Sequence, residues 1–367
     1  MTIVEVNSKR KLKQFIDFPY ALYSENKYWV PPLRMDENAL LSESHPIWKG
    51  KKRKGFLAIE NGKIQGRIMA IIQPSGIGSF GFLEVKKDNN EAFNELIKSV
   101  ETWLQSNGCQ EIIGPLNPDI NNTMGLLIDG FGQRPTIMMT YNNKEIPEMI
   151  EKYGFSVDRT FSSYELTPEK FIDYEKLQRV KSWLEKKHKV SVRNPNMRDF
   201  NRELKIFHKI YNSAFKMHYG TCELEWETFK LMGKGMKLII NPELVFVIEK
   251  DKSPVGFLLA LPDYNEVFAK MKGGRLFPFG WFHFLRNRRN IERVRIMTMA
   301  IDPKFQHLGL GSLVYSLMSK SIDDCNYKYA ELGWVDDENI KMAKACKLMG
   351  GKVSKRYAVF KKTLNDE

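Results

Sequence analysis

Alternation of apolar and polar residues marks one β-hairpin in each half of the chain. Residues 56–70 alternate around Asn61-Gly62, a dipeptide typical of tight hairpin turns. In the other half, residues 245–260 repeat the pattern around the polar stretch 250–254. Each hairpin has Ile-Glu before its turn and a glycine four positions ahead of an alanine. The pattern predicts antiparallel strand pairs at corresponding positions of the two halves.

Further helix and strand signals follow each hairpin at similar distances. A helical pattern at residues 143–155 precedes a strand-like run at 161–166. In the other half, Asn339 precedes Gly350 by the same number of residues as Asn143 precedes Gly154. Residues 357–360 then form the closing strand-like run. Duplication of one α/β unit explains both echoes, although chance similarity between two α/β domains remains an alternative.

These signals predict two domains, at residues 1–166 and 190–367. The charged segment 167–189 between them has apolar residues at helical spacing, which predicts a linker helix. Those apolar residues are Phe171, Leu177, Val180 and Leu184. A length of 367 residues also favours two domains over one core.

A glycine-rich loop between a strand and a helix is the motif that carries chemistry. Residues 293–301 alternate and are rich in β-formers, Asp302-Pro303 ends the strand, and residues 312–322 show an apolar helical face. Between them stands Gln-His-Leu-Gly-Leu-Gly at 306–311. Glycines let backbone N–H groups approach an anion, and the following helix N-terminus adds partial positive charge. The spacing therefore indicates a diphosphate cradle, with neither the lysine of a Walker loop nor a dinucleotide fingerprint.

In this order of elements the sequence resembles the GNAT superfamily of acetyl-CoA-dependent N-acyltransferases, over roughly residues 190–362. The resemblance implies an α/β (α+β) fold with two GNAT-like domains, each a mixed, largely antiparallel sheet flanked by helices. It implies acetyl-CoA or another acyl-CoA as co-substrate and an amine, on a small molecule or a peptide, as acceptor. It assigns cofactor binding to the strand end, the loop and one helix start: Met299, Ala300, Ile301, Gln306, His307, Leu308, Gly309, Leu310, Gly311, Ser312 and Asn339.

Three residues are candidates for proton transfer. Glu331 lies on the predicted strand 329–335, beside the gap in which the resemblance places the thioester; the competing interpretation is a sheet-face carboxylate paired to a lysine. The family carries a general-acid tyrosine seven residues after the helix-starting asparagine, and here that position is Cys346. Tyr357 on the closing strand is a substitute by residue type alone.

The N-terminal half resembles a degenerate copy of the same unit. Its counterpart of the glycine loop, residues 86–91, contains no glycine and carries two carboxylates, Asp88 and Glu91. Negative charge at this place opposes anion binding. We therefore predict that coenzyme A does not bind there.

Composition changes this picture little. A net charge of +13 favours a polyanionic partner such as a phosphate-rich cofactor, nucleic acid or an anionic membrane, or else a solvated basic surface. The four cysteines lack metal-ligand or paired spacing, which suits a reducing cytoplasm, and the histidines form no metal pair. No secretory signal and no apolar run long enough to span a bilayer is expected, so we predict a cytoplasmic protein without a metal.

An insertion at about residues 264–292 exceeds what a strand connection needs. Its aromatic and basic residues at 270–289 fit a lid over the acceptor site, a homodimer surface, a membrane-surface anchor, or a satellite cluster packed on the sheet. No recognition-helix pattern accompanies them, so nucleic acid is not the expected partner.

Two rivals to an N-acyltransferase, most simply an N-acetyltransferase, remain. A non-catalytic acyl-CoA binding or sensing module is favoured by Cys346 in place of the acid. A nucleic-acid binding protein is favoured by the net charge. The glycine loop favours the first two interpretations over the third.

Overall fold

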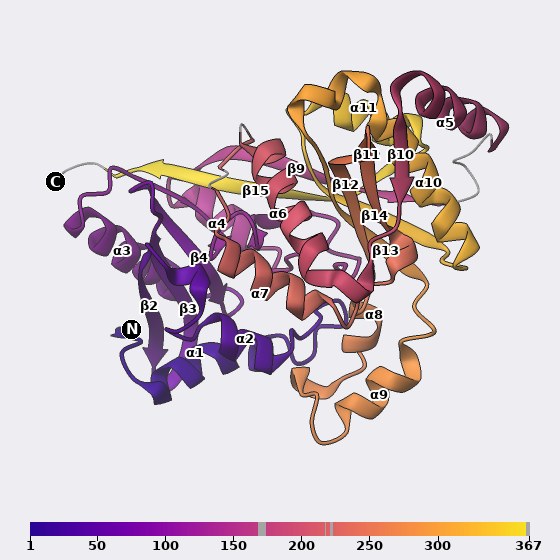
Figure 1. Ribbon diagram of the computed structural model, residues 1–367. Helices are drawn as coiled ribbons and strands as arrows, with labels where there is room; N and C mark the ends of the chain where they lie inside the picture. The colour runs from indigo at the N-terminus through magenta and orange to yellow at the C-terminus, as the bar shows by residue number, and fades with distance from the viewer. Residues whose placement is uncertain (168–173, 217, 221–222, 365–367) are drawn as a thin grey trace. The chain divides into compact units, whose positions relative to one another are not determined.

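The computed structural model describes residues 1–167, 174–216, 218–220 and 223–364 (Figure 1). Contacts divide the chain into two compact units. The first unit comprises Met1–Phe161, Asn265–Arg288 and Lys355–Glu367, and the second comprises Ser162–Tyr264 and Arg289–Ser354. Each unit contains a mixed sheet with helices, which confirms the predicted α/β class.

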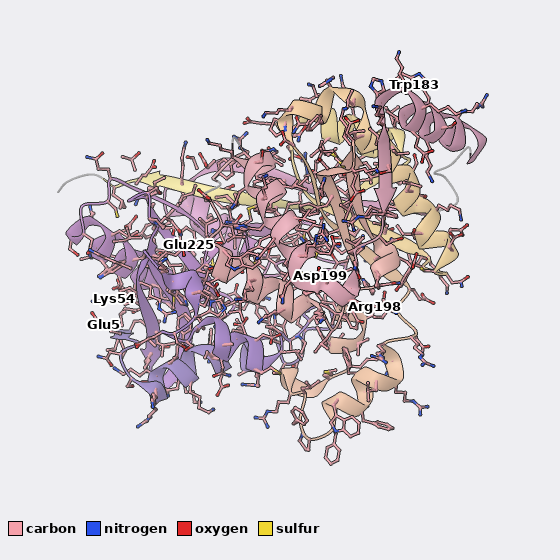
Figure 2. All side chains as sticks on the ribbon, viewed as in Figure 1. Glu5, Lys54, Trp183, Arg198, Asp199 and Glu225 are labelled. Atoms are coloured by element: carbon pink, nitrogen blue, oxygen red, sulfur yellow. The ribbon has the colours of Figure 1, made fainter. Side chains whose placement is uncertain are left out.

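The sheet of the first unit has the strand order β1-β2-β3-β4-β5-β15, and β8 also pairs with β15. Neighbours are antiparallel except β4 and β5, which are parallel. On β1 and β2, Glu5 and Lys54 form an ion pair at 2.9 Å (Figure 2). The elements are β1 Thr2–Glu5, α1 Lys9–Leu22, α2 Arg34–Leu40, β2 Lys52–Glu60, β3 Lys63–Ile72, β4 Gly78–Val85, α3 Asn90–Ser106, β5 Glu111–Gly114, β6 Leu116–Asn117, β7 Thr123–Met124, β8 Leu126–Asp129, α4 Ile146–Lys152, α8 Asn265–Phe268 and α9 Gly280–Asn287. Two strands, β9 Ser156–Leu166 and β15 Lys352–Thr363, each have residues in both units.

The sheet of the second unit has the order β9-β14-β13-β12-β11-β10. β13 and β14 are parallel, and β10 to β13 are antiparallel neighbours. The elements are α5 Tyr174–His188, β10 Val190–Arg193, α6 Phe200–Phe215, α7 Trp226–Met236, β11 Val245–Lys250, β12 Ser253–Pro262, β13 Arg293–Ile301, α10 Leu310–Asp324, β14 Tyr329–Asp336 and α11 Ile340–Leu348. Short 3-10 turns lie at Pro46–Trp48, Met197–Asp199, Pro242–Leu244, Lys272–Gly274 and Pro303–Leu308.

The two predicted hairpins are confirmed. β2 and β3 are joined by Asn61 and Gly62, with φ of 49° and 72°. β11 and β12 are joined by Asp251 and Lys252, with φ of 48° and 63°, a shorter turn than the polar stretch predicted. Two left-handed residues in succession match the twist of a tight antiparallel hairpin.

The core of the second unit has two layers, one on each face of the sheet. Helix α10 packs Leu313, Val314 and Met318 onto one face, and each buried side chain of this kind contributes about 1.5–3 kcal/mol. Helix α6 covers the other face with Phe207 and Ile210. The sheet is therefore shielded on both sides where β13 leads into the glycine loop.

The units divide the chain differently from the predicted domains. Residues 356–358 of β15 pair with β8 and residues 360–363 pair with β5 in the first unit, while residues 162–166 of β9 belong to the second. Each unit therefore receives part of a strand from the distant half of the sequence. The predicted linker helix is α5 of the second unit, where Leu184 is 1% exposed in the core. Phe171 lies outside the described residues.

Candidate functional site

The glycine loop joins β13 to α10 as predicted. β13 ends at Ile301, a 3-10 turn covers Pro303–Leu308, and Gln306 Nε2 donates to the carbonyl oxygen of Ile301 at 3.1 Å. Gly309 has a φ of 71°, a left-handed conformation that favours glycine. Helix α10 begins at Leu310, two residues earlier than predicted, because the chain turns at Gly309 rather than after Gly311.

The start of α10 is open to an anion. Gly309 is the N-cap and supplies no side-chain acceptor, so no capping side chain occupies the first N–H groups of the helix. The first turn contains no acidic residue, and Gln306, His307 and Ser312 are exposed around it. A Cβ built on Gly309 meets nothing within 4 Å. The backbone here can therefore approach a diphosphate closely.

Close packing beneath the loop explains the second glycine. A Cβ on Gly311 would lie 3.3 Å from the Met299 Cε atom. Met299 packs against the core, and its neighbours Ala300 and Ile301 are buried. The loop and the end of β13, both predicted to contact the cofactor, are thus one packed assembly.

β13 and β14 pair at one end and separate at the other. Their parallel register runs from Arg293↔Tyr329 to Ile296↔Leu332. Beyond it, residues 297–301 and 333–336 continue without a further pair between the described residues of the two strands. On its other edge β13 has a bulge, because Ile296 pairs with Ala260 and Thr298 with Leu259, leaving Met297 as the extra residue. Just before the glycine loop, the edge of β13 that faces β14 is therefore not paired with that strand. We call this separation of the two strands the gap between β13 and β14.

A cluster of charged side chains lies along the paired parts of β13 and β14. Glu331 is fully buried, and its Oε2 is 3.7 Å from Nη1 of Arg293. Arg293 Nη2 also contacts Glu165 Oε2 at 3.2 Å. Buried Arg295 donates to the carbonyl oxygen of Gly333 at 3.1 Å and lies over the ring of Trp334 at 5.2 Å. Arg293 is thus an ion partner of Glu331.

These arginines were missed as site residues from the sequence. Arg293 and Arg295 occupy alternate positions of a strand whose intervening residue, Val294, is in the core. Charged residues at every second position of a buried strand share one face. This alternation is the sequence signal that could have identified the two arginines.

The other candidate residues have structural contacts. Cys346 is fully buried in the core, and burial raises the pKa of its thiol to about 12. Asn339 caps α11, its side-chain oxygen accepting from the Met342 N–H at 3.1 Å. Tyr357 is fully buried on β15, opposite Leu127 in the first unit. Of the candidate acid–base residues, Glu331 alone is on a strand bordering the gap between β13 and β14.

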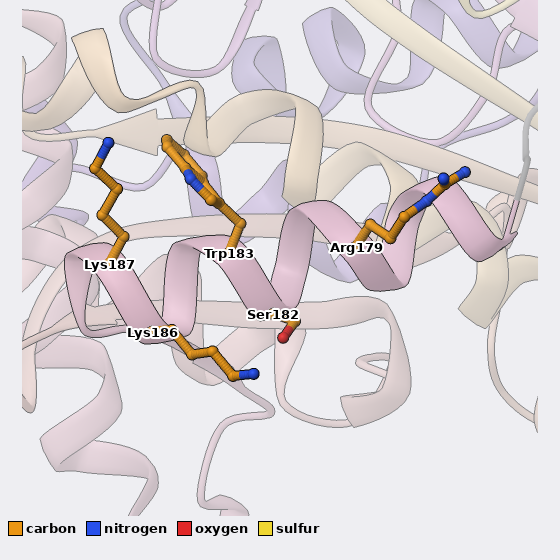
Figure 3. A pocket seen from close by; sticks show the side chains of 5 residues that line it. All are labelled: Arg179, Ser182, Trp183, Lys186 and Lys187. Atoms are coloured by element: carbon orange, nitrogen blue, oxygen red, sulfur yellow. The ribbon is translucent and has the colours of Figure 1, made fainter.

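A hollow of about 520 Å³ lies on α5 and is lined by no residue of this loop. All the side chains that line it come from that helix, and Lys187 Nζ lies 5.2 Å from the ring of Trp183 (Figure 3). One helix with open surroundings holds no convergent polar groups, so the hollow has none of the features of a reaction site. The lining residues are Arg179, Ser182, Trp183, Lys186 and Lys187.

Across the described residues, no group of three or more His, Cys, Asp or Glu is arranged to hold a metal ion. A search of the same residues also finds no helix with the length and apolar character needed to cross a membrane.

Solved structures share this fold. A tandem GNAT protein from the clavulanic acid biosynthesis pathway matches with a TM-score of 0.57 and 10% identity over 100% of both chains. A GCN5-related N-acetyltransferase from Sphaerobacter thermophilus matches with a TM-score of 0.51 and 12% identity, over 85% of this chain and 81% of that one. The tandem arrangement of two GNAT-like units is therefore the architecture of this chain.

Sequence relatives extend along the whole chain. The bacterial ceramide synthase of Caulobacter vibrioides is 30% identical over 380 residues, which cover 99% of this chain and 98% of the relative. The chain has a tandem GNAT fold and belongs to the family of the bacterial ceramide synthase. Protein YghO of Escherichia coli is 28% identical over 375 residues, 97% of this chain and 94% of the relative. No family model matches the chain.

Proposed function

We propose that this tandem GNAT protein is an acyl-CoA-dependent N-acyltransferase whose site lies in the second unit. The observation that carries the proposal is the separation of β13 from β14 immediately before an uncapped helix start. A strand edge offers a line of backbone donors and acceptors, and a helix N-terminus offers N–H groups to a diphosphate. An acyl-CoA has both parts, an amide-rich arm and a diphosphate.

In this proposal the diphosphate contacts the loop from Gln306 to Ser312, with Gly309 at its centre. The amide-rich arm pairs with the backbone of Met299, Ala300 and Ile301. The thioester carbonyl then enters the gap, where a backbone N–H beside the Met297 bulge stabilises the developing oxyanion. Asn339, which caps α11, would also contact the acyl-CoA at that helix start.

The reaction is direct transfer from sulfur to nitrogen. The amine nitrogen attacks the thioester carbon, the C–N bond forms, and the C–S bond breaks. Glu331 accepts the amine proton through water, while Arg293 holds its carboxylate in place at 3.7 Å. The coenzyme A thiolate takes its proton from water. Burial raises the pKa of the Cys346 thiol to about 12, whereas a free thiol has a pKa near 8.5. Because Cys346 binds its proton so tightly, the proposed mechanism assigns it no role in proton transfer.

The acceptor that we propose is a long-chain amine. A ceramide is an N-acylated long-chain amino alcohol, and a family member bears the name bacterial ceramide synthase with 30% identity along 99% of this chain. Under this proposal the acyl donor is a fatty acyl-CoA, and acetyl-CoA is the comparison substrate. Both lie within the acyl-CoA class that the glycine loop predicts.

Turnover of defined substrates tests the proposal. The purified full chain is incubated with sphinganine and with acyl-CoAs from acetyl to palmitoyl, and free coenzyme A thiol and the amide mass are measured. Thiol release with a matching amide supports the proposal and gives the preferred acyl length. Turnover with a short amine alone would retain the reaction and reject the long-chain acceptor.

A second candidate is an acyl-CoA sensing module without turnover. The complete burial of Cys346 and Glu331 favours it, since neither is open to solvent in this state. It predicts binding of acyl-CoA, measured by titration calorimetry, with no amide formed from any amine. Amide formation with release of coenzyme A thiol would reject the sensing module.

A further inference from the structure

The insertion between β12 and β13 carries an exposed aromatic surface. It belongs to the first unit and contains α8, a 3-10 turn and α9. The side chains of Phe277 and Phe279 are 69% and 77% exposed. Further large apolar side chains exposed on the same segment are Trp281, Phe282 and Leu285. The structure therefore does not place these residues in a cluster packed on a sheet; we call them the aromatic tip.

The base of the insertion is held by contacts with the rest of the first unit, so the aromatic tip projects from an ordered segment. Buried Asn265 donates from Nδ2 to the carbonyl oxygen of Pro135 at 2.9 Å. Arg34 Nε donates to the carbonyl oxygen of Gly273 at 2.8 Å. At Gly274, a Cβ would lie only 2.1 Å from the Pro32 carbonyl oxygen, so backbone meets backbone there. Segments fixed in this way present the tip in a defined orientation on their own unit.

Within its own segment, the aromatic tip is accompanied by positively charged side chains alone. Residues 267–289 contain no aspartate or glutamate. Lys270, Arg275, Arg286 and Arg288 are exposed beside the aromatic side chains. Short amphipathic segments with Trp, Phe and Leu among Lys and Arg are typical of helices that lie in the interface of an anionic membrane.

We propose that the aromatic tip is a membrane anchor that docks the first unit onto an anionic lipid bilayer without crossing it. The apolar rings enter the boundary between headgroups and acyl chains, and the basic side chains contact lipid phosphates. A second copy of the chain is a poorer occupant, because a two-fold interface would place this basic surface against itself. The inference is independent of acyl transfer, since docking needs neither acyl-CoA nor an acceptor amine.

Vesicle co-sedimentation of the full chain tests the anchor. The vesicles are phosphatidylcholine alone or phosphatidylcholine with phosphatidylglycerol, at low and high salt. We expect partitioning onto the anionic vesicles that falls with salt, and a loss of about ten-fold or more for Phe277→Ser with Phe279→Ser. The matched control is Leu238→Ser with Leu348→Ser, which removes apolar side chains that are 83% and 89% exposed elsewhere. The control should bind as the parent chain does.

A second pair of variants separates charge from apolar insertion. Arg286→Gln with Arg288→Gln should weaken binding to anionic vesicles by several-fold and leave binding to phosphatidylcholine unchanged. Arg198→Gln with Arg202→Gln, on the exposed surface of the second unit, is the matched control (Arg198 in Figure 2).

Three outcomes would overturn the anchor. One is no partitioning of the parent chain onto anionic vesicles at low salt. Another is equal binding by the tip variant and its control. The third is a salt-sensitive complex with DNA or RNA, or a self-association in ultracentrifugation, that the tip variant abolishes while vesicle binding stays absent.

Discussion

The starts of α3 and α10 stand at corresponding places in the two units, each after a strand with a parallel partner. At α10 the N-cap is Gly309, which supplies no side-chain acceptor. At α3 the N-cap is Asn89, whose side-chain oxygen accepts from the Ala92 N–H at 2.9 Å, and Glu91 adds a carboxylate in the first turn. The first unit thus caps with its own side chains the helix start that the second unit leaves without a side-chain cap.

The gaps beside the two strands differ in the same way. In the second unit β14 leaves β13 after Ile296↔Leu332. In the first, the side-chain oxygen of Asn117 accepts from the Phe82 N–H at 2.6 Å, and a Cβ on Gly81 would lie 2.0 Å from the Leu116 carbonyl oxygen. The chain itself therefore occupies the edge of β4. The two units thus share a fold, while the unpaired strand edge and the uncapped helix start are found in the second.

The two units also differ at the position of Glu331, because β14 has the sequence Glu331-Leu-Gly where β5 has Ile112-Ile-Gly. Glu331→Gln should lower kcat by about 10²-fold or more while leaving acyl-CoA affinity unchanged, since it removes the proton acceptor. Steady-state kinetics over a range of pH, with calorimetry for binding, measure both. Glu331→Asp should recover part of the rate. A lower melting temperature with unchanged kcat would reduce Glu331 to the ion partner of Arg293.

The loop can be tested by placing the charge of the first unit into the second. Gly309→Asp and Gly309→Asn have side chains of equal size that tolerate a left-handed conformation. We expect the aspartate variant to bind coenzyme A at least about ten-fold more weakly than the asparagine variant, because its charge faces the diphosphate. Titration calorimetry gives both affinities. Equal affinities would place the diphosphate elsewhere.

A buried acid on β4 gives the first unit a pH dependence of its own. Burial raises the pKa of Glu84 to about 7, with Arg67 opposing the shift, and Tyr23 donates a hydrogen bond to its carboxyl group. The native state therefore holds a proton that the unfolded chain releases near 4.3, so stability falls as pH rises from about 4.5 to 7.

Glu84→Gln should flatten this dependence, since an amide keeps a hydrogen bond without a charge. The change in unfolding free energy between pH 5 and pH 7.5 should shrink by an amount on the order of 1 kcal/mol. Urea titrations of both proteins at the two pH values measure it. A slope that survives the substitution must come from other groups.

The smallest expected effect is at the cap of α3. Asn89→Ala should lower the free energy of unfolding by about 1 kcal/mol through the lost cap. The stabilisation by acyl-CoA, about 2.7 kcal/mol at a hundred times its dissociation constant, should stay unchanged. Thermal unfolding with and without ligand measures both quantities. A variant that gains a second coenzyme A site would instead make the cap the barrier to binding in the first unit.

Local signals in the sequence determined most elements near the site. The strand 293–301 is observed with its predicted bounds, the Asn61-Gly62 turn is in place, and Gly309 adopts the left-handed conformation that a glycine permits. The helix after the loop begins two residues early, because apolar periodicity does not reveal at which glycine the chain turns. Alternation and turn residues act over a few positions, so the sequence alone suffices for them.

Tertiary structure decided what is distant in the sequence. The assignment of the end of β15 and of the insertion to the first unit depends on which strands and loops meet. Burial decided that Cys346 has a pKa of about 12, and the pairing of β13 with β14 set Glu331 beside Arg293. A residue type gives the chemistry that a side chain can perform. Its proton affinity and its partners come from the elements packed around it, and these contacts are fixed only when the whole chain has folded.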